Sequence, residues 1–257
     1  WGAESVLVDE ISRCKPEHQN RLFSLVHERR IQGIALDTLR YRWAAMNPCT
    51  SDQGEGEEYL GSEPLDPALA DRFSVIVDVG DWDELSTADR KRISNPAGEG
   101  LISNDGGALK KALTVWRQKF ETKLESCAPK IIDYACAVVT TLGDGGIRIS
   151  PRRSRLLTRT LLAAGIIDGG FKDKSFHGVL EASLPHRTWG DPPDTDKVLA
   201  AHRLAWDAAM LSGDEQWVHR FHLEHSLARK VRLLRDDCPG SDTGTLAVEQ
   251  LLASEPK

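Results

Sequence analysis

The sequence has no long apolar run. Its longest weakly charged stretch, residues 134–143, is far shorter than the roughly 18 apolar residues that a membrane span needs. The first residues form no basic and apolar leader, so we expect neither a membrane span nor secretion. With 40% hydrophobic and 28% charged residues, the composition fits neither a disordered nor a collagen-like chain. The 257 residues predict a globular protein of one large domain or two modest ones.

Cysteine is scarce and scattered. The five cysteines are an odd number and include no C-x-x-C pair, which indicates reduced thiols in the cytoplasm rather than disulfides or a zinc site. Long blocks of like charge are also missing, because 33 Lys and Arg are interspersed with 39 Asp and Glu. The resulting net charge of -6 argues against generic binding to nucleic acid.

The N-terminal part has the pattern of a parallel sheet. Residues 3–11 form an aliphatic run that ends in two carboxylates, which is typical of a buried strand. Apolar residues then recur at helical spacing over 16–30, and a second strand is expected at 39–46. This order indicates a βαβ unit. Three further segments are expected next, namely an acidic glycine-rich loop at 49–63, a short helix at 66–71 and an alternating strand at 73–79.

Beyond residue 80 the pattern becomes helical, and no further strand is expected. One amphipathic stripe consists of Leu109, Leu113, Trp116, Phe120 and Leu124. Further helices are expected near 130–142, 151–166, 175–184, 195–211 and 214–236. The sequence therefore predicts an α/β domain at 1–94 followed by an all-α domain at 95–257, with a linker around 95–107.

Two adjacent carboxylates, Asp9 and Glu10, end the first predicted strand. In nucleotide hydrolases such a pair has a specific use, since the first carboxylate helps to hold Mg²⁺ and the second polarises the attacking water. Taken alone, the Asp-Glu pair is equally consistent with a catalytic site and with two acidic residues that simply begin a turn.

A wider series of motifs resembles a known family. The segments are VLVDEISR at 6–13, QN at 19–20, ERR at 28–30, AAMNP at 44–48, LDPALADRF at 65–73 and SPRR at 150–153. In this order they resemble the MoxR-like branch of the AAA+ ATPases. The resemblance covers residues 1 to about 170, and it implies a P-loop NTPase parallel sheet followed by a helical lid.

The resemblance implies roles for five residues. Asp9 would belong to the Mg²⁺ shell, and Glu10 would orient the attacking water. Asn47 would be sensor 1, whose amide contacts the γ-phosphate or that water. Arg152, on the lid helix, would be sensor 2. Arg72 would be the arginine finger that a neighbouring subunit inserts toward the nucleotide.

Plain structural roles also fit these positions. Asn47 suits a turn before a proline, and Arg72 suits a surface ion pair with Asp71. The Ser-Pro pair at 150–151 is typical of a helix start, and this prediction does not depend on the family resemblance. Only the family pattern selects Arg152 over the two arginines at 153 and 155.

The phosphate-binding loop of the family is missing, because no G-x-x-x-x-G-K-[ST] occurs in the sequence. In the family this loop lies upstream of the Asp-Glu strand, and here that strand begins almost at Trp1. We therefore expect that these residues lack the P-loop, its strand and an adjoining strand, and that they are inactive alone.

Histidines suggest a second candidate site. His219, His222 and His225 recur at i, i+3 and i+6 beside Glu224. Steps of three residues spread side chains around a helix, and no H-E-x-x-H occurs, so a structural helix is the preferred interpretation over a metal site.

The resemblance implies ATP hydrolysis with Mg²⁺ by a cytoplasmic homo-oligomer, expected to be a hexameric ring, that remodels or assembles a client protein. In this family the client commonly carries a von Willebrand factor A domain. Two alternatives stay open: a non-catalytic interaction module that lacks a P-loop, and another AAA+ branch such as a chelatase subunit or a transcriptional activator.

Overall fold

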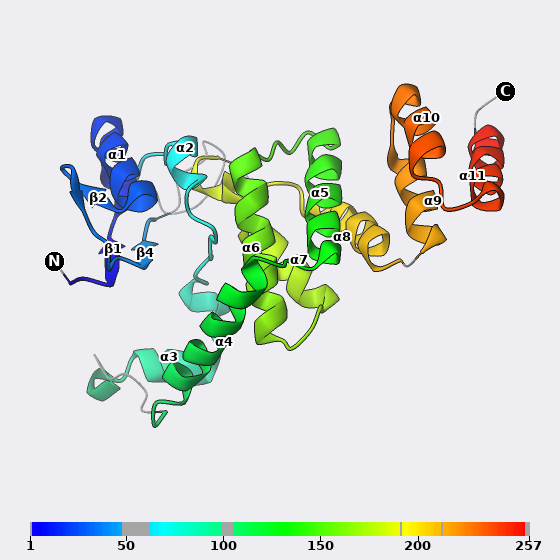
Figure 1. Ribbon diagram of the computed structural model, residues 1–257. Coiled ribbons are helices and arrows are strands. Elements are labelled where there is room, and N and C mark those ends of the chain that lie inside the picture. The colour runs from blue at the N-terminus through cyan, green and yellow to red at the C-terminus, as the bar shows by residue number, and fades with distance from the viewer. Residues whose placement is uncertain (1, 48–61, 99–104, 191, 212, 255–257) are drawn as a thin grey trace. The chain divides into compact units, whose positions relative to one another are not determined.

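The computed structural model describes residues 2–47, 62–98, 105–190, 192–211 and 213–254 (Figure 1). The chain divides into two units, which are described separately. Unit 1 comprises residues 1–126 and 159–192, and unit 2 comprises residues 127–158 and 193–257. The described residues are mostly helical and include a small parallel sheet, in line with the expected α/β and all-α segments. The predicted domain division between residues 94 and 95 stays a prediction.

A two-stranded parallel sheet begins unit 1. β1 (Ser5–Val8) pairs with β4 (Tyr41–Ala44) in a register that sets Val8 opposite Ala44 (Figure 1). Between them the chain forms α1 (Pro16–Phe23), followed by a π-helical turn at Ser24–Glu28. Both strands and the helix between them were predicted and are confirmed, although the α-helix ends earlier than expected.

A short hairpin between α1 and β4 was not predicted. It pairs β2 (Arg30–Ile31) with β3 (Ile34–Ala35) in antiparallel fashion. The loop residues Gln32 and Gly33 both have positive φ, 50° and 83°. Two positive φ values in a two-residue loop match the twist of the paired strands.

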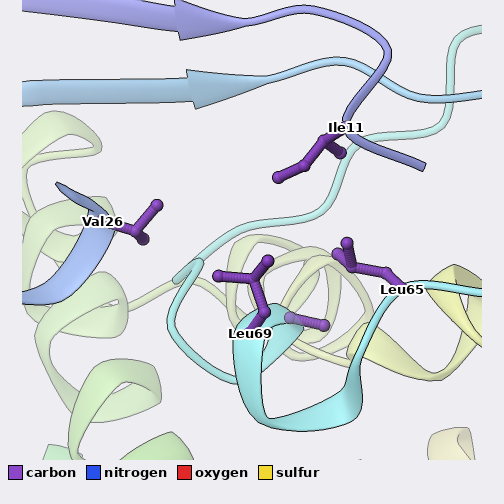
Figure 2. Packing of buried hydrophobic residues seen from close by; sticks show 5 residues of the cluster. Ile11, Val26, Leu65 and Leu69 are labelled. Carbon is purple, nitrogen blue, oxygen red and sulfur yellow. The ribbon is translucent and has the colours of Figure 1, made fainter. Parts of the chain in front are cut away.

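An apolar cluster packs against the sheet. Its buried members are Ile11, Val26, Leu65, Leu69 and Ala70. Figure 2 shows Ile11, from the segment that leaves β1, close to Leu65 and Leu69, with Val26 approaching from the turn after α1. Partly buried side chains of Val8, Leu22, Phe23, Met46, Phe73 and Trp189 surround the cluster. The cluster therefore joins the sheet, α1 and α2 (Pro67–Ala70).

The predicted strand at 73–79 is wrong. These residues form no strand, and no strand pairs with them in the described part of the chain. The Ile76 N–H instead donates to the Ala182 carbonyl at the end of α7 (Asp173–Ala182), at 2.6 Å. The alternating pattern thus gave no information about a pairing partner.

The remaining helices of unit 1 follow the predicted pattern in part. α4 (Ala108–Leu124) and α7 were expected, whereas α3 (Thr87–Ile93) was not. α6 (Pro151–Ile167) begins in unit 2 and ends in unit 1. In the described part of unit 1, 3₁₀ turns lie at Ile11–Arg13, Trp82–Glu84, Pro96–Gly98 and Pro185–Thr188.

Unit 2 has two packed helices at its centre. α5 (Pro129–Asp144) lies against α8 (Thr195–Met210), and the Tyr134 hydroxyl forms a 2.8 Å hydrogen bond with Nδ1 of His202. Both side chains are fully buried. The Trp206 ring meets Tyr134 edge-on, with centroids 6.4 Å apart. This polar contact fixes how the two helices face each other.

The C-terminal part of unit 2 holds three helices. They are α9 (Asp214–Leu223), α10 (Leu227–Asp236) and α11 (Ser241–Ser254). A single helix over 214–236 was predicted; it is interrupted at Glu224, whose extended backbone ends α9 and whose carboxylate accepts from the Ser226 N–H at 2.8 Å. α11 was not predicted. None of the helices in the described residues is long and apolar enough to cross a membrane.

Replacing Tyr134 with Phe should destabilise unit 2. Removing one partner of a buried hydrogen bond costs about 1–3 kcal/mol, and we expect the free energy of unfolding to fall by that amount. Urea denaturation followed by circular dichroism measures the change. Tyr41→Phe, at an exposed position of β4, is the matched control and should cost less than about 0.5 kcal/mol. Equal losses in the two variants would contradict a structural role for the Tyr134 hydroxyl.

Candidate functional site

The carboxyl ends of β1 and β4 bring distant parts of the sequence together. Asp9 and Glu10 follow β1 directly, and Asn47 follows β4 after two intervening residues. The Ala45 N–H donates to the Val8 carbonyl, and the Ile11 N–H donates to the Ala45 carbonyl, both at 3.0 Å. The segments that leave the two strands are therefore joined, at the end of a parallel sheet where α/β proteins bind ligands.

Glu10 adopts an uncommon backbone conformation. Its φ of 49° and ψ of 44° lie in the left-handed region, which costs a residue with a Cβ roughly 1–2 kcal/mol. The Glu10 N–H donates to Oδ1 of Asp9 at 3.0 Å. The turn sends Ile11 into the apolar cluster while the Glu10 side chain stays 56% exposed. The turn thus leaves the Glu10 carboxylate exposed to solvent, while the next residue is anchored in the apolar cluster.

The Glu10 carboxylate has a cationic neighbour. Nε of Arg13 lies 3.2 Å from its Oε2, and the Arg13 side chain is itself 53% exposed. Ion pairs this exposed contribute only about 0–1 kcal/mol, so Arg13 restrains the carboxylate without locking it. Sequence reasoning missed this pair, although the i, i+3 spacing of an acid and a base was visible.

Asn47 is half-buried and is anchored through its main chain. Its carbonyl accepts a hydrogen bond from Oγ of Ser62 at 3.0 Å. The Glu63 N–H donates to the Ser12 carbonyl at 3.1 Å, next to the turn that carries Glu10. Most of the predicted acidic loop at 49–63 lies outside the described residues, but its last two residues contact both halves of the site.

Gln19 connects α1 to the segment that carries Arg72. Its side chain is fully buried, its Nε2 donates to the Cys14 carbonyl at 3.0 Å, and its Oε1 accepts from the Asp66 N–H at 2.9 Å. Asp66 in turn caps α2, because its Oδ1 accepts from the N–H groups of Ala68 and Leu69 at 2.7 and 3.2 Å. One buried amide therefore positions the start of α2.

The sequence contains a pattern that marks Gln19 as a core position. Gln19, Leu22 and Val26 recur at helical spacing, so the amide occupies a core position of the helix. A polar side chain at such a position needs hydrogen-bond partners inside the protein. The sequence could have predicted a buried polar contact, but not that Asp66 would supply it.

Arg72 follows α2 and is held by its own chain. Its guanidinium donates to the Ala68 carbonyl and lies 4.2 Å from the centroid of the Phe23 ring. A cation over an aromatic face is stabilised by about 0.5–2 kcal/mol. Contacts with Phe23 and Ala68 of the same chain therefore orient the Arg72 side chain. The pair with Asp71 stays a prediction.

Three of the predicted residues adjoin one apolar cluster. Ile11 follows Glu10, Met46 precedes Asn47 and Phe73 follows Arg72. Ile11 is a buried member of the cluster around Leu69, and Met46 and Phe73 pack against it. The roles predicted for Glu10, Asn47 and Arg72 stay predictions, but their backbones depend on a common core.

Arg152 belongs to unit 2, where its side chain is exposed on the first turn of α6. The predicted helix start is confirmed, since Oγ of Ser150 accepts from the Arg153 N–H at 3.0 Å. The next side chain, Arg153, is fully buried. Exposure makes Arg152 the more accessible of the two for an anionic ligand, while its sensor 2 role stays a prediction.

The donor types near Asp9 suit a hard cation. Mg²⁺ is commonly held by one or two protein carboxylates together with substrate phosphates and water, and Asp9 supplies one such carboxylate. Among the described residues, no group of three or more His, Cys, Asp or Glu side chains is arranged to hold a metal ion. His222 instead meets Gln250 at 3.0 Å, and His225 lies 3.4 Å from Asp144. The Mg²⁺ role of Asp9 stays a prediction.

Comparison with protein-family models, with curated proteins and with solved structures finds no match for the chain.

Replacing Gln19 with Leu should loosen the start of α2. The substitution leaves the Asp66 N–H and the Cys14 carbonyl without this partner, and we expect a loss of about 1–3 kcal/mol in unfolding free energy. Hydrogen exchange of the Asp66 amide should also accelerate. Asn20→Leu alters a neighbouring, exposed amide and is the matched control. Unchanged exchange at Asp66 in Gln19→Leu would rule out the bridging role.

Proposed function

We propose that the chain is part of a MoxR-like AAA+ ATPase that uses ATP hydrolysis to remodel or assemble a client protein. The observation that carries the proposal is the parallel pairing of β1 with β4, after which Asp9, Glu10 and Asn47 leave adjacent strands at the same edge. This arrangement fits the motif series that resembles Walker B and sensor 1.

The proposed chemistry assigns each residue a task that its surroundings allow. Asp9 would help to hold Mg²⁺, which when bound neutralises phosphate charge. Glu10 would orient the attacking water and take up its proton, and the weak, exposed pair with Arg13 leaves its carboxylate accessible for this task. The Asn47 amide would contact the same water or the γ-phosphate. Arg152 in cis and Arg72 in trans would neutralise developing charge.

The P-loop that this chemistry needs is not in these residues, and one face of the sheet is exposed. Leu7, Tyr41 and Trp43 lie on the face opposite Val6 and Val8 and are exposed. Parallel sheets are normally covered on both faces, and a two-stranded sheet is only marginally stable alone. The exposed face therefore supports further elements that pack on the sheet, as the proposed P-loop NTPase domain requires.

The proposed assembly is a cytoplasmic homo-oligomeric ring, hexameric by the family pattern, with a client that carries a von Willebrand factor A domain. In such a ring the Phe23 face would hold the Arg72 guanidinium ready for the neighbouring site. A chelatase subunit or a transcriptional activator would use the same chemistry on another client.

A non-catalytic interaction module is the second candidate. It is favoured by one observation, the lack of a P-loop in the sequence. The coding sequence upstream of Trp1 separates the two functions, because an in-frame P-loop supports the ATPase and a start codon immediately before Trp1 supports the module.

Glu10→Gln tests water activation in the form of the protein that includes a P-loop. Because Glu10 acts on the nucleophile and contributes little to nucleotide affinity, ATP binding should persist while kcat falls by about 100-fold or more. Calorimetry and a phosphate-release assay measure the two quantities. Glu17→Gln, at an exposed position of α1, is the matched control and should keep full turnover. Near-normal ATP hydrolysis by Glu10→Gln would contradict the role of Glu10 in orienting the attacking water.

Mixed rings test whether Arg72 acts across a subunit boundary. A chain with Arg72→Ala keeps an intact Glu10, and a chain with Glu10→Gln keeps an intact Arg72. If one active site needs both residues from different chains, mixing the two inactive variants should restore measurable ATPase activity. Circular dichroism checks that loss of the Phe23 contact has not unfolded the first variant. No recovery, with subunit exchange verified, would assign Arg72 to its own chain.

A further inference from the structure

α4 carries the amphipathic stripe that the sequence predicts, and the structure leaves much of this stripe uncovered. None of the residues of the helix, Ala108–Leu124, is buried. In the stripe, Leu109, Leu113 and Leu124 are 57%, 50% and 37% exposed, and its two aromatic residues, Trp116 and Phe120, are half-buried. The proposed ATPase chemistry uses no residue of α4, so the inference below is independent of that function.

A contact with α6 lies at one point of the stripe. The guanidinium carbon of Arg159 is 5.6 Å from the centroid of the Phe120 ring. Arg159 is itself exposed, so it covers part of the ring and adds a cation beside the stripe. Leu113 and Leu109 lie two and three turns before Phe120, and both remain open to solvent.

Cations border the stripe along its length. α4 contains five of them, Lys110, Lys111, Arg117, Lys119 and Lys123, and one carboxylate, Glu121, although the whole chain has a net charge of -6. Residues three or four positions apart are neighbours on a helix. Lys110 and Arg117 therefore flank Leu113. Lys119 and Lys123 each lie one turn beyond an aromatic residue of the stripe.

The charges of the four lysines are not neutralised within the described residues. Glu121 pairs with Arg117, whose Nε lies 3.0 Å from its Oε1, and no described carboxylate is within ion-pair distance of the lysines. The side of α4 opposite the stripe holds the uncharged residues Thr114, Gln118 and Thr122, at intervals of four. Most of the positive charge therefore lies beside the apolar stripe, where a ligand of the stripe would meet it.

We propose that α4 binds the surface of a membrane that contains anionic phospholipid. The exposed leucines would enter the boundary between headgroups and acyl chains, and the flanking lysines would extend to the phosphate and carboxylate groups above them. A nucleic acid would use the cations but not the leucines between them. A second copy of α4 would bring two basic helices together, which like-charge repulsion disfavours.

The contact with Arg159 favours a flat partner over a groove. A groove in an acidic protein would enclose the stripe from both of its borders, whereas Arg159 already occupies the space over Phe120. A bilayer approaches from one side only. It can therefore contact the exposed leucines and the flanking cations while the contact with α6 is kept.

Vesicle binding by the 257-residue chain tests the proposal. In co-sedimentation, vesicles of equal parts phosphatidylserine and phosphatidylcholine should bind the chain at least about tenfold more tightly than vesicles of phosphatidylcholine alone, because several cations near an anionic surface act together. High salt should weaken this preference. Absence of binding, or equal binding to both kinds of vesicle, would overturn the proposal.

A matched pair of variants locates the contact on α4. Leu113→Gln should weaken binding to phosphatidylserine vesicles about tenfold, because one apolar side chain no longer enters the lipid. Val115→Gln is the control, since Val115 is 49% exposed but lies almost on the opposite side of the helix and should leave binding unchanged. Circular dichroism checks that both variants keep their helices. Equal losses in the two variants would contradict a contact through the stripe.

Two double variants separate the charge of α4 from the net charge of the chain. Lys119→Gln with Lys123→Gln should reduce the preference for phosphatidylserine about tenfold or more and leave the weak binding to phosphatidylcholine unchanged. Lys174→Gln with Lys197→Gln removes the same charge from exposed positions outside α4 and should have little effect. The same loss in both double variants would mean that α4 is not the binding element.

Two further measurements identify other occupants of the stripe. Leu113-dependent dimerisation in analytical ultracentrifugation, without vesicle binding, would assign the stripe to a second copy of the chain. Binding to polyglutamate that Leu113→Gln weakens, again without vesicle binding, would assign it to an acidic protein. Either result would refute the membrane proposal.

Discussion

The Gln19 amide donates one hydrogen bond to the Cys14 carbonyl before α1 and accepts another from the Asp66 N–H at the start of α2. Because the Gln19 side chain is buried, its amide needs both hydrogen bonds inside the protein, and these bonds hold the two segments at a fixed spacing. The cap of α2, the path of the chain to Arg72 and the position of Leu69 in the core all follow from this spacing.

Around this rigid contact, the candidate site is built from exposed groups. The carboxylates of Asp9 and Glu10 lie on the outside of a turn whose next residue, Ile11, is buried. The division has a physical reason: the hydrophobic effect fixes the backbone, while the charged side chains remain hydrated and able to exchange partners. The left-handed conformation of Glu10 is tolerated because Ile11 and the parallel strand pair hold both sides of it.

Sequence patterns predicted the elements with strong periodicity and missed those defined by pairing or by local turns. β1, β4 and α5 followed from apolar runs and helical spacing, and their order predicted the parallel pairing of the two strands. The β2–β3 hairpin was missed because Gln32-Gly33 is not a usual turn dipeptide. Residues 73–79 have the alternation of a strand, yet alternation does not specify a neighbour. The contact of Gln19 could not be predicted, since its partner Asp66 lies 47 positions away.

The segment after Arg72 has a consequence for the behaviour of the chain in solution. Its β-branched residues at 75, 76, 77 and 79 form a run of high β-propensity, which is the kind of sequence that favours cross-β association. The run is interrupted by Asp78, which forms an ion pair with Arg187. A charge within such a run opposes association, because stacking copies of the segment would stack like charges. We therefore expect Asp78 to limit self-association of the chain through this segment.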